Sequence, residues 1–135
     1  MKTSPVFMSP DDDCQKVAQH MRDRNLGFLP VCDEYGEPVG TITDRDLCLR
    51  ICAEDRRASQ TKVSDVMTHH VVSCSPEDDI SEAEELMSRH KKGRVMVLEN
   101  GKLIGVISLS DVARRDTEEK AGHTLREIVS REVRA

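Results

Sequence analysis

The feature that most constrains the fold of this chain is an internal duplication. Residues 40–46 read Gly-Thr-Ile-Thr-Asp-Arg-Asp, and residues 105–111 read Gly-Val-Ile-Ser-Leu-Ser-Asp. Both segments have glycine first, isoleucine third, a hydroxyl residue fourth and aspartate last. Two copies of one unit usually pack as a pseudo-symmetric pair, and any site that the motif builds then occurs twice.

The duplication extends well beyond this motif. With an offset of 66 residues, the matched pairs are Pro10 and Pro76, Asp12 and Asp78, Asp13 and Asp79, Met21 and Met87, Gly27 and Gly93, and Val31 and Val97. The second copy then lacks one residue, and Gly36, Gly40, Ile42 and Asp46 match Gly101, Gly105, Ile107 and Asp111. The length change falls where a hairpin turn is expected, which is where chains tolerate it best.

Each copy is predicted to contain a helix, two strands and a second helix. In the second copy, residues 76–79 open a helix whose apolar stripe is Ile80, Ala83, Leu86 and Met87. Residues 95–98 and 103–107 are predicted strands around Asn100-Gly101, a strong hairpin signal. The first copy repeats this with the stripe Cys14, Val17 and Met21 and with strands at 29–32 and 39–43. Helices are expected at 44–53 and 110–115, so the fold class is α/β of the α+β type.

The expected domain boundaries follow the repeat. Residues 1–62 form the first repeat with its linker, 63–116 the second repeat, and 117–135 a C-terminal helical extension. Residues 63–68 are predicted to be a short helix that leads into the second repeat. The extension carries an apolar face that needs a partner surface, so a homodimer is expected. That face consists of Leu125, Ile128, Val129 and Val133.

Composition excludes several classes of function. The chain has 135 residues and a formal net charge of -5, and neither half is strongly basic, which argues against a nucleic-acid partner. No apolar run approaches the roughly 18 residues of a membrane span. The first ten residues lack the pattern of a signal peptide, so a soluble, cytoplasmic protein without a membrane partner is expected. The five cysteines are scattered, which suggests reduced thiols instead of a disulfide framework.

The ordered duplication resembles the CBS-domain family, named for cystathionine beta-synthase, over about residues 5–115. The segments that carry the resemblance are 27–33, 40–46 and 62–79, and the chain looks most like small stand-alone bacterial CBS-pair proteins. The resemblance implies two halves whose sheets pack around a pseudo-two-fold axis, leaving two clefts. It also implies regulatory binding of AMP, ADP, ATP or S-adenosylmethionine, no obligatory cofactor, dimerisation, and an unidentified regulated protein.

The repeated motif suits a nucleoside on physical grounds. A carboxylate at the first turn of a helix can accept two hydrogen bonds from a ribose diol, and Asp46 and Asp111 are placed to do so. The hydroxyls of Thr43 and Ser108 can reach the ribose or a phosphate. Arg45 adds a guanidinium suited to phosphate. The resemblance further implies a phosphate contact for Arg94, where the first copy has Phe28.

Other interpretations of the same residues remain open. Thr43 with Asp46, and Ser108 with Asp111, also fit a capping box, which needs no ligand. The chain is then an interaction module of the same fold with no physiological ligand. Cys48 and Cys52 share a helix face and are either buried apolar residues or a metal or redox site. An enzyme is disfavoured because no catalytic spacing of cysteine, serine or histidine recurs, and no metal site is predicted.

Overall fold

The computed structural model describes residues 5–115, which separate into two compact units. The first unit comprises residues 6–71, and the second contains residues 72–115. The two units are described in turn. No helix among the described residues is long and apolar enough to cross a membrane.

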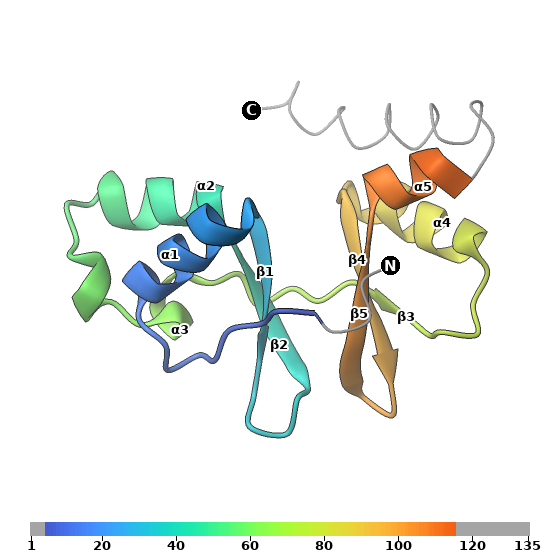
Figure 1. Cartoon of the computed structure of the whole chain (residues 1–135), viewed down its shortest axis with the longest axis horizontal. Helices are drawn as coiled ribbons and strands as arrows, with labels where there is room; N and C mark the ends of the chain where they lie inside the picture. Colours follow the sequence, from blue (N-terminus) through green and yellow to red (C-terminus); the bar gives the residue numbers. More distant parts are fainter. Residues whose placement is uncertain (1–4, 116–135) are drawn as a thin grey trace. The chain divides into compact units, whose positions relative to one another are not determined.

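The first unit is a hairpin with its helices gathered on one side (Figure 1). It contains α1 (Cys14–Arg24), β1 (Phe28–Cys32), β2 (Pro38–Thr43) and α2 (Asp44–Leu47). The chain continues from α2 into a π-helical turn, η1 (Cys48–Cys52), then a 3₁₀ turn, η2 (Ala58–Gln60), and α3 (Val63–Val66). The single helix predicted at 44–53 is therefore two short elements with different hydrogen bonding.

The second unit repeats this order over a shorter span (Figure 1). It contains β3 (Ser73–Cys74), α4 (Ile80–His90), β4 (Arg94–Glu99), β5 (Lys102–Ser108) and α5 (Leu109–Arg115). Helices α1 and α4 end alike, because Asn25 and Lys91 both adopt the left-handed conformation that closes a helix. The apolar stripes of these two helices explain why both were predictable.

The strand pairing shows that the duplication is structural. Strands β1 and β2 are antiparallel, with Val31 opposite Gly40, and β4 and β5 place Val97 opposite Gly105. Both hairpins have a bulge directly after the valine. In each unit, a segment that comes before the first helix pairs in parallel with the first strand of the hairpin. Met8 pairs with Val31 of β1, and Cys74 pairs with Val97 of β4.

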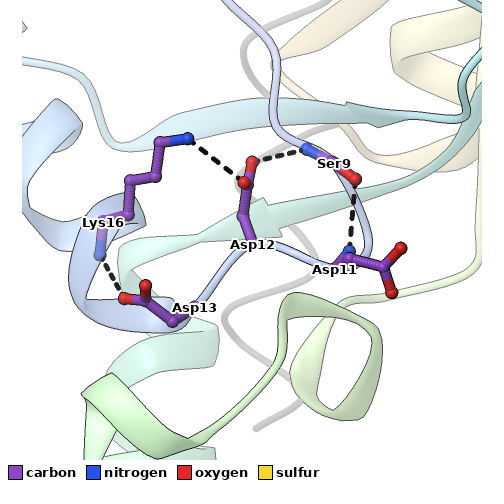
Figure 2. A network of polar contacts seen from close by, with 5 residues as sticks. All are labelled: Ser9, Asp11, Asp12, Asp13 and Lys16. Carbon is purple, nitrogen blue, oxygen red and sulfur yellow. Dashed lines mark hydrogen bonds and ion pairs between the residues drawn. The ribbon is translucent and has the colours of Figure 1, made fainter.

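A polar network fixes the turn between the pairing segment and α1 (Figure 2). The backbone N–H of Ser9 donates to Asp12 Oδ2 at 2.8 Å, and the N–H of Asp11 donates to Ser9 Oγ at 3.2 Å. Asp13 is the N-cap of α1 and accepts from the N–H of Lys16 at 2.9 Å. Lys16 Nζ also lies 3.2 Å from Asp12 Oδ1.

The same turn recurs in the second unit. There the N–H of Ser75 donates to Asp78 Oδ2 at 2.9 Å, and Asp79 is the N-cap of α4. The paired aspartates that the sequence repeats therefore have a local structural role. In both units the first aspartate closes the turn after the edge strand. The second aspartate stands at the N-cap position in both, but only Asp13 accepts a capping hydrogen bond through its side chain, and Asp79 does not.

The core of the first unit gathers side chains from α1, both strands and α3. Its buried members are Met8, Cys14, Val17, Met21, Leu29, Val31, Ile42, Ile51, Val63, Val66 and Met67. Helix α3 thus packs against the first repeat, although residues 63–68 were expected to lead into the second. The compact units divide between Val71 and Val72, whereas the repeat boundary expected from the sequence lies between residues 62 and 63.

The second unit has a smaller core between α4, the sheet and α5. Val72, Met87, Val95 and Val112 are buried there. Half-buried apolar side chains complete it, namely Cys74, Ile80, Leu86, Ile107 and Leu109. The apolar face predicted for the C-terminal extension, with Leu125, Ile128, Val129 and Val133, lies outside the described residues.

Candidate ligand site

In the first unit, the candidate site forms where β2 ends and α2 begins. The backbone N–H and the hydroxyl of Thr43 both donate to Asp46 Oδ2, at 2.9 Å and 3.1 Å. The N–H of Asp46 lies 3.2 Å from Thr43 Oγ1, which completes a capping box. Thr43 and Asp46 are thus held in one fixed geometry by hydrogen bonds that need no ligand.

The second unit builds the same arrangement between β5 and α5. The N–H and hydroxyl of Ser108 donate to Asp111 Oδ2 at 2.9 Å and 3.1 Å, and the N–H of Asp111 lies 3.3 Å from Ser108 Oγ. The capping interpretation is therefore correct for the local structure of both copies. It does not remove the ligand interpretation, because the capping box uses only Oδ2 of each carboxylate, and each carboxylate has two oxygens that accept hydrogen bonds.

A residue far along the chain also reaches Asp46. Thr68 Oγ1 lies 3.5 Å from Asp46 Oδ1, a long and weak contact. The backbone of Thr68 pairs with Thr41 through two hydrogen bonds of 2.9 Å, which extends the sheet beyond β2. The segment 66–68, which we call the connector because it leads out of the first unit, therefore passes directly beside the candidate site.

Arg50 holds the same connector from the π-helical turn. Its Nη1 donates to the carbonyl oxygens of Val66 at 2.8 Å and Met67 at 3.2 Å, where α3 ends. Carbonyl groups at a helix C-terminus lack partners within the helix, and a cation there is favourable. Sequence reasoning missed both Arg50 and Thr68, because these interactions span 16 to 22 residues and leave no local signal.

The predicted cationic residues divide between the two units. Arg45 lies in α2 and is exposed, and its backbone N–H donates to Asp44 Oδ1 at 2.9 Å. Arg94 begins β4 directly opposite Ser108, whereas Phe28 is opposite Thr43. Residues directly opposite one another in an antiparallel pair are close neighbours on one face. The structure thus brings Arg94 beside Ser108 and puts an aromatic ring in the corresponding place of the first unit.

The cysteines divide by environment. Burial raises the pKa of Cys14 and of Cys32 from 9.0 to about 11, and also raises the pKa of Cys74. Cys48 and Cys52 are exposed, so the expectation that they could be buried apolar residues is wrong. Within residues 5–115, no group of three or more histidine, cysteine or acidic side chains is arranged to hold a metal ion.

Comparison with known proteins decides the family. The family model described as "CBS domain" matches residues 1–52 and residues 63–118, so it finds both repeats. This chain belongs to the CBS-domain family. The α+β fold class and the tandem CBS units expected from the sequence are confirmed.

One relative is the CBS domain-containing protein YhcV of Bacillus subtilis (strain 168). It is 36% identical over 129 residues, which cover 95% of this chain and 91% of the relative. Among solved structures, the CBS-domain protein ATU1752 from Agrobacterium tumefaciens is 30% identical with a TM-score of 0.72, covering 83% of this chain and 89% of its own.

A more distant structure contains bound ligands. The CBS domain pair of protein MJ0100, in complex with 5'-methylthioadenosine and S-adenosyl-L-methionine, has a TM-score of 0.72 and 21% identity. The match covers 84% of this CBS chain and 92% of the MJ0100 chain. At this identity the likeness concerns the fold.

Proposed function

We propose that this CBS pair is a regulatory module that binds an adenosine-containing ligand, without catalysis, and signals to a partner protein by a conformational change. The observation that carries the proposal is the pair of equivalent hydroxyl–carboxylate units, Thr43 with Asp46 and Ser108 with Asp111. Each is fixed at the same junction of strand and helix. The ligand of the MJ0100 complex supports the adenosine class.

A ribose fits the polar groups at this junction. Its neighbouring 2' and 3' hydroxyls are two donors on one face, and one carboxylate oxygen has two lone pairs with which to accept them. Asp46 Oδ2 is occupied by Thr43, so the ribose would approach Oδ1, where Thr68 Oγ1 is the neighbour at 3.5 Å. A bond from the ribose to the charged carboxylate would be shorter and stronger than this contact.

The two units would differ in their preference for phosphate. Arg94 beside Ser108 offers the second unit a guanidinium that can pair with a phosphate group. In the first unit Phe28 takes that place, and the cation is Arg45, on the helix that follows. We therefore expect the second site to favour AMP, ADP or ATP over uncharged nucleosides more strongly than the first site does.

Calorimetric titration and thermal melting test the proposal. The ligands are adenosine, 5'-methylthioadenosine, S-adenosylmethionine, AMP, ADP and ATP. A ligand that binds only the folded state, at 100 times its dissociation constant, adds about 2.7 kcal/mol to the free energy of unfolding. Stabilisation by at least one of these compounds, with saturation, supports the proposal.

The capping boxes favour one alternative. If all six compounds leave the melting temperature unchanged, the hydroxyl–carboxylate units are caps alone, and the chain is an interaction module without a physiological ligand. In either case we propose a cytoplasmic homodimer, because the sequence of the C-terminal extension carries an apolar face that needs a partner surface.

A further inference from the structure

The duplication explains three of the five cysteines as core residues. Their counterparts in the other repeat are apolar: Ile80 for Cys14, Leu98 for Cys32 and Met8 for Cys74. These three thiols are buried or half-buried, as small apolar side chains are in a core. The counterparts of Cys48 and Cys52 are Ala113 and Thr117. Cys48 and Cys52 are themselves exposed, so packing in a core does not account for them.

Cys48 and Cys52 are both exposed and lie at the two ends of one π-helical turn. The N–H of Ala53 donates to the carbonyl of Cys48 at 2.9 Å, five residues back, which is the bonding of a π-helix. Residues four apart on a helix are neighbours on one face. Single π-helical turns within helices are uncommon and frequently occur at functional sites. The two exposed cysteines therefore lie on one side of an unusual turn.

We propose that Cys48 and Cys52 form a two-thiolate binding site for a soft metal ion of the cuprous class. Thiolates are soft ligands that select Cu(I). Structural zinc sites take four ligands. Among the described residues no histidine, cysteine or acidic side chain joins a group of three that could hold a metal. Two thiolates on one face of a turn suit Cu(I), because this ion can be held by two sulfur ligands.

The binding step involves no change of oxidation state. One Cu(I) ion forms a bond to each sulfur, and each thiol releases its proton to solvent. Binding therefore strengthens as the pH rises, because the ligand is the thiolate. The bound ion links both ends of the turn that also carries Arg50, whose guanidinium holds the connector at Val66 and Met67. Metal binding thus acts on the element that fixes the connector.

The test is an anaerobic titration of the reduced full-length chain with Cu(I), against a chromophoric Cu(I) chelator as competitor. We expect one Cu(I) per chain. Changing residues around a metal's ligands already costs roughly 10–100-fold in affinity. Cys48→Ser and Cys52→Ser, which each remove a ligand, should therefore each weaken binding by more than about tenfold. Cys74→Ser removes a half-buried thiol outside the pair and should leave the affinity unchanged.

Alkylation provides a second measurement on the unaltered protein. Cu(I) should protect Cys48 and Cys52 from iodoacetamide together, as followed by peptide mass spectrometry. Three results would overturn the proposal. The first is a Cu(I) affinity of Cys48→Ser within about twofold of that of the unaltered chain. The second is a stoichiometry of one Cu(I) ion shared between two chains. The third is competition of Zn(II) with Cu(I) for the two cysteines.

Discussion

The carboxylates of Asp46 and Asp111 each have two roles. Each closes a capping box, and each is proposed to bind the ribose of the ligand. Oδ2 closes the capping box in both residues, and at Asp46 the ribose is proposed to use Oδ1. The two roles have different magnitudes. A helix cap contributes about 1 kcal/mol to stability, while a hydrogen bond to a charged group contributes roughly 1.5–3 kcal/mol.

Asp46→Ala should therefore cost more in ligand affinity than in stability. We expect a loss of about 1 kcal/mol in the free energy of unfolding and of roughly 1.5–3 kcal/mol in binding to the first site. Chemical denaturation and calorimetry measure the two quantities. Glu37→Ala, which removes an exposed carboxylate elsewhere in the first unit, is the control and should change neither. A loss of stability with unchanged ligand affinity would indicate a cap alone.

Gly40 is a residue whose replacement should damage the first unit. A Cβ atom at Gly40 would lie 2.4 Å from the carbonyl oxygen of Thr68, the backbone group that accepts from Thr41. Gly40→Ala should destabilise the chain by roughly 1–3 kcal/mol, the usual cost of overpacking. A Cβ at Gly93 would meet nothing within 4 Å, so Gly93→Ala should stay within about 0.5 kcal/mol of the unaltered chain. Urea unfolding compares the two variants.

The buried thiols predict a loss of stability at alkaline pH. The pKa of Cys14 and of Cys32 is raised from 9.0 to about 11, so the unfolded chain releases these protons at lower pH than the folded chain does. Below pH 9 both states keep the protons, and these thiols contribute no pH dependence. Between about pH 9 and 11, the free energy of unfolding should fall by at most about 1.4 kcal/mol per pH unit for each thiol.

Cys14→Ala isolates this effect from the lysines and the tyrosine that titrate in the same range. The variant is less stable at pH 7, because it loses a buried side chain. Its stability should nevertheless decline less steeply above pH 9 than that of the unaltered chain. Parallel declines would show that Cys14 does not ionise on unfolding.

At the scale of elements, local sequence patterns were enough to predict the helices and hairpins, but they did not predict how the connector packs. The stripes on 14–24 and 80–90, and the turn signals at Gly36 and Asn100-Gly101, are local and gave the right elements. The hydroxyl–aspartate pairs were likewise visible, because a capping box spans a few residues. The π-helical turn was not, since residues 44–53 have an ordinary helical pattern. The packing of α3 on the first unit depends on long-range contacts of Val63, Val66 and Met67.

Arg50→Ala should loosen the connector specifically. It removes the donor to Val66 and Met67 and leaves the end of α3 without its cation. We expect a loss of about 1 kcal/mol or somewhat more, with faster hydrogen exchange at the Thr68 amide, which donates to Thr41. The matched control is Arg56→Ala. Arg56 reaches Asp65 of α3 only through an exposed ion pair of 3.8 Å, which should contribute little. Similar exchange at Thr68 in both variants would contradict the assigned role of Arg50.

At the scale of the whole molecule, two copies of one unit provide two candidate sites with unlike surroundings. The hydrogen bonds, the bulge and the edge pairing repeat in both units, while Phe28 and Arg94 differ. The duplicated units thus share their backbone structure and differ in the residues beside the two candidate sites.

The expected homodimer is tested by light scattering. A mass of twice 15.2 kDa at high micromolar concentration would support the dimer, and a monomer under these conditions would contradict it. The apolar residues from which the dimer was expected, Leu125, Ile128 and Val129, can be changed together to serine as a matched variant. Loss of the dimer in that variant alone would assign the interface to the C-terminal extension.

Calorimetric titration of the unaltered chain and of the double variant Asp46→Ala/Asp111→Ala is the decisive test of ligand binding through these two aspartates. The same six adenosine compounds are used, and circular dichroism establishes that the double variant is folded. If it is not, Asp46→Asn/Asp111→Asn takes its place, because the amide oxygen can still accept from Thr43 and Ser108. We expect saturable binding of at least one compound to the unaltered chain and a loss of affinity of more than about tenfold in the double variant. Unchanged affinity in the folded double variant would contradict this expectation.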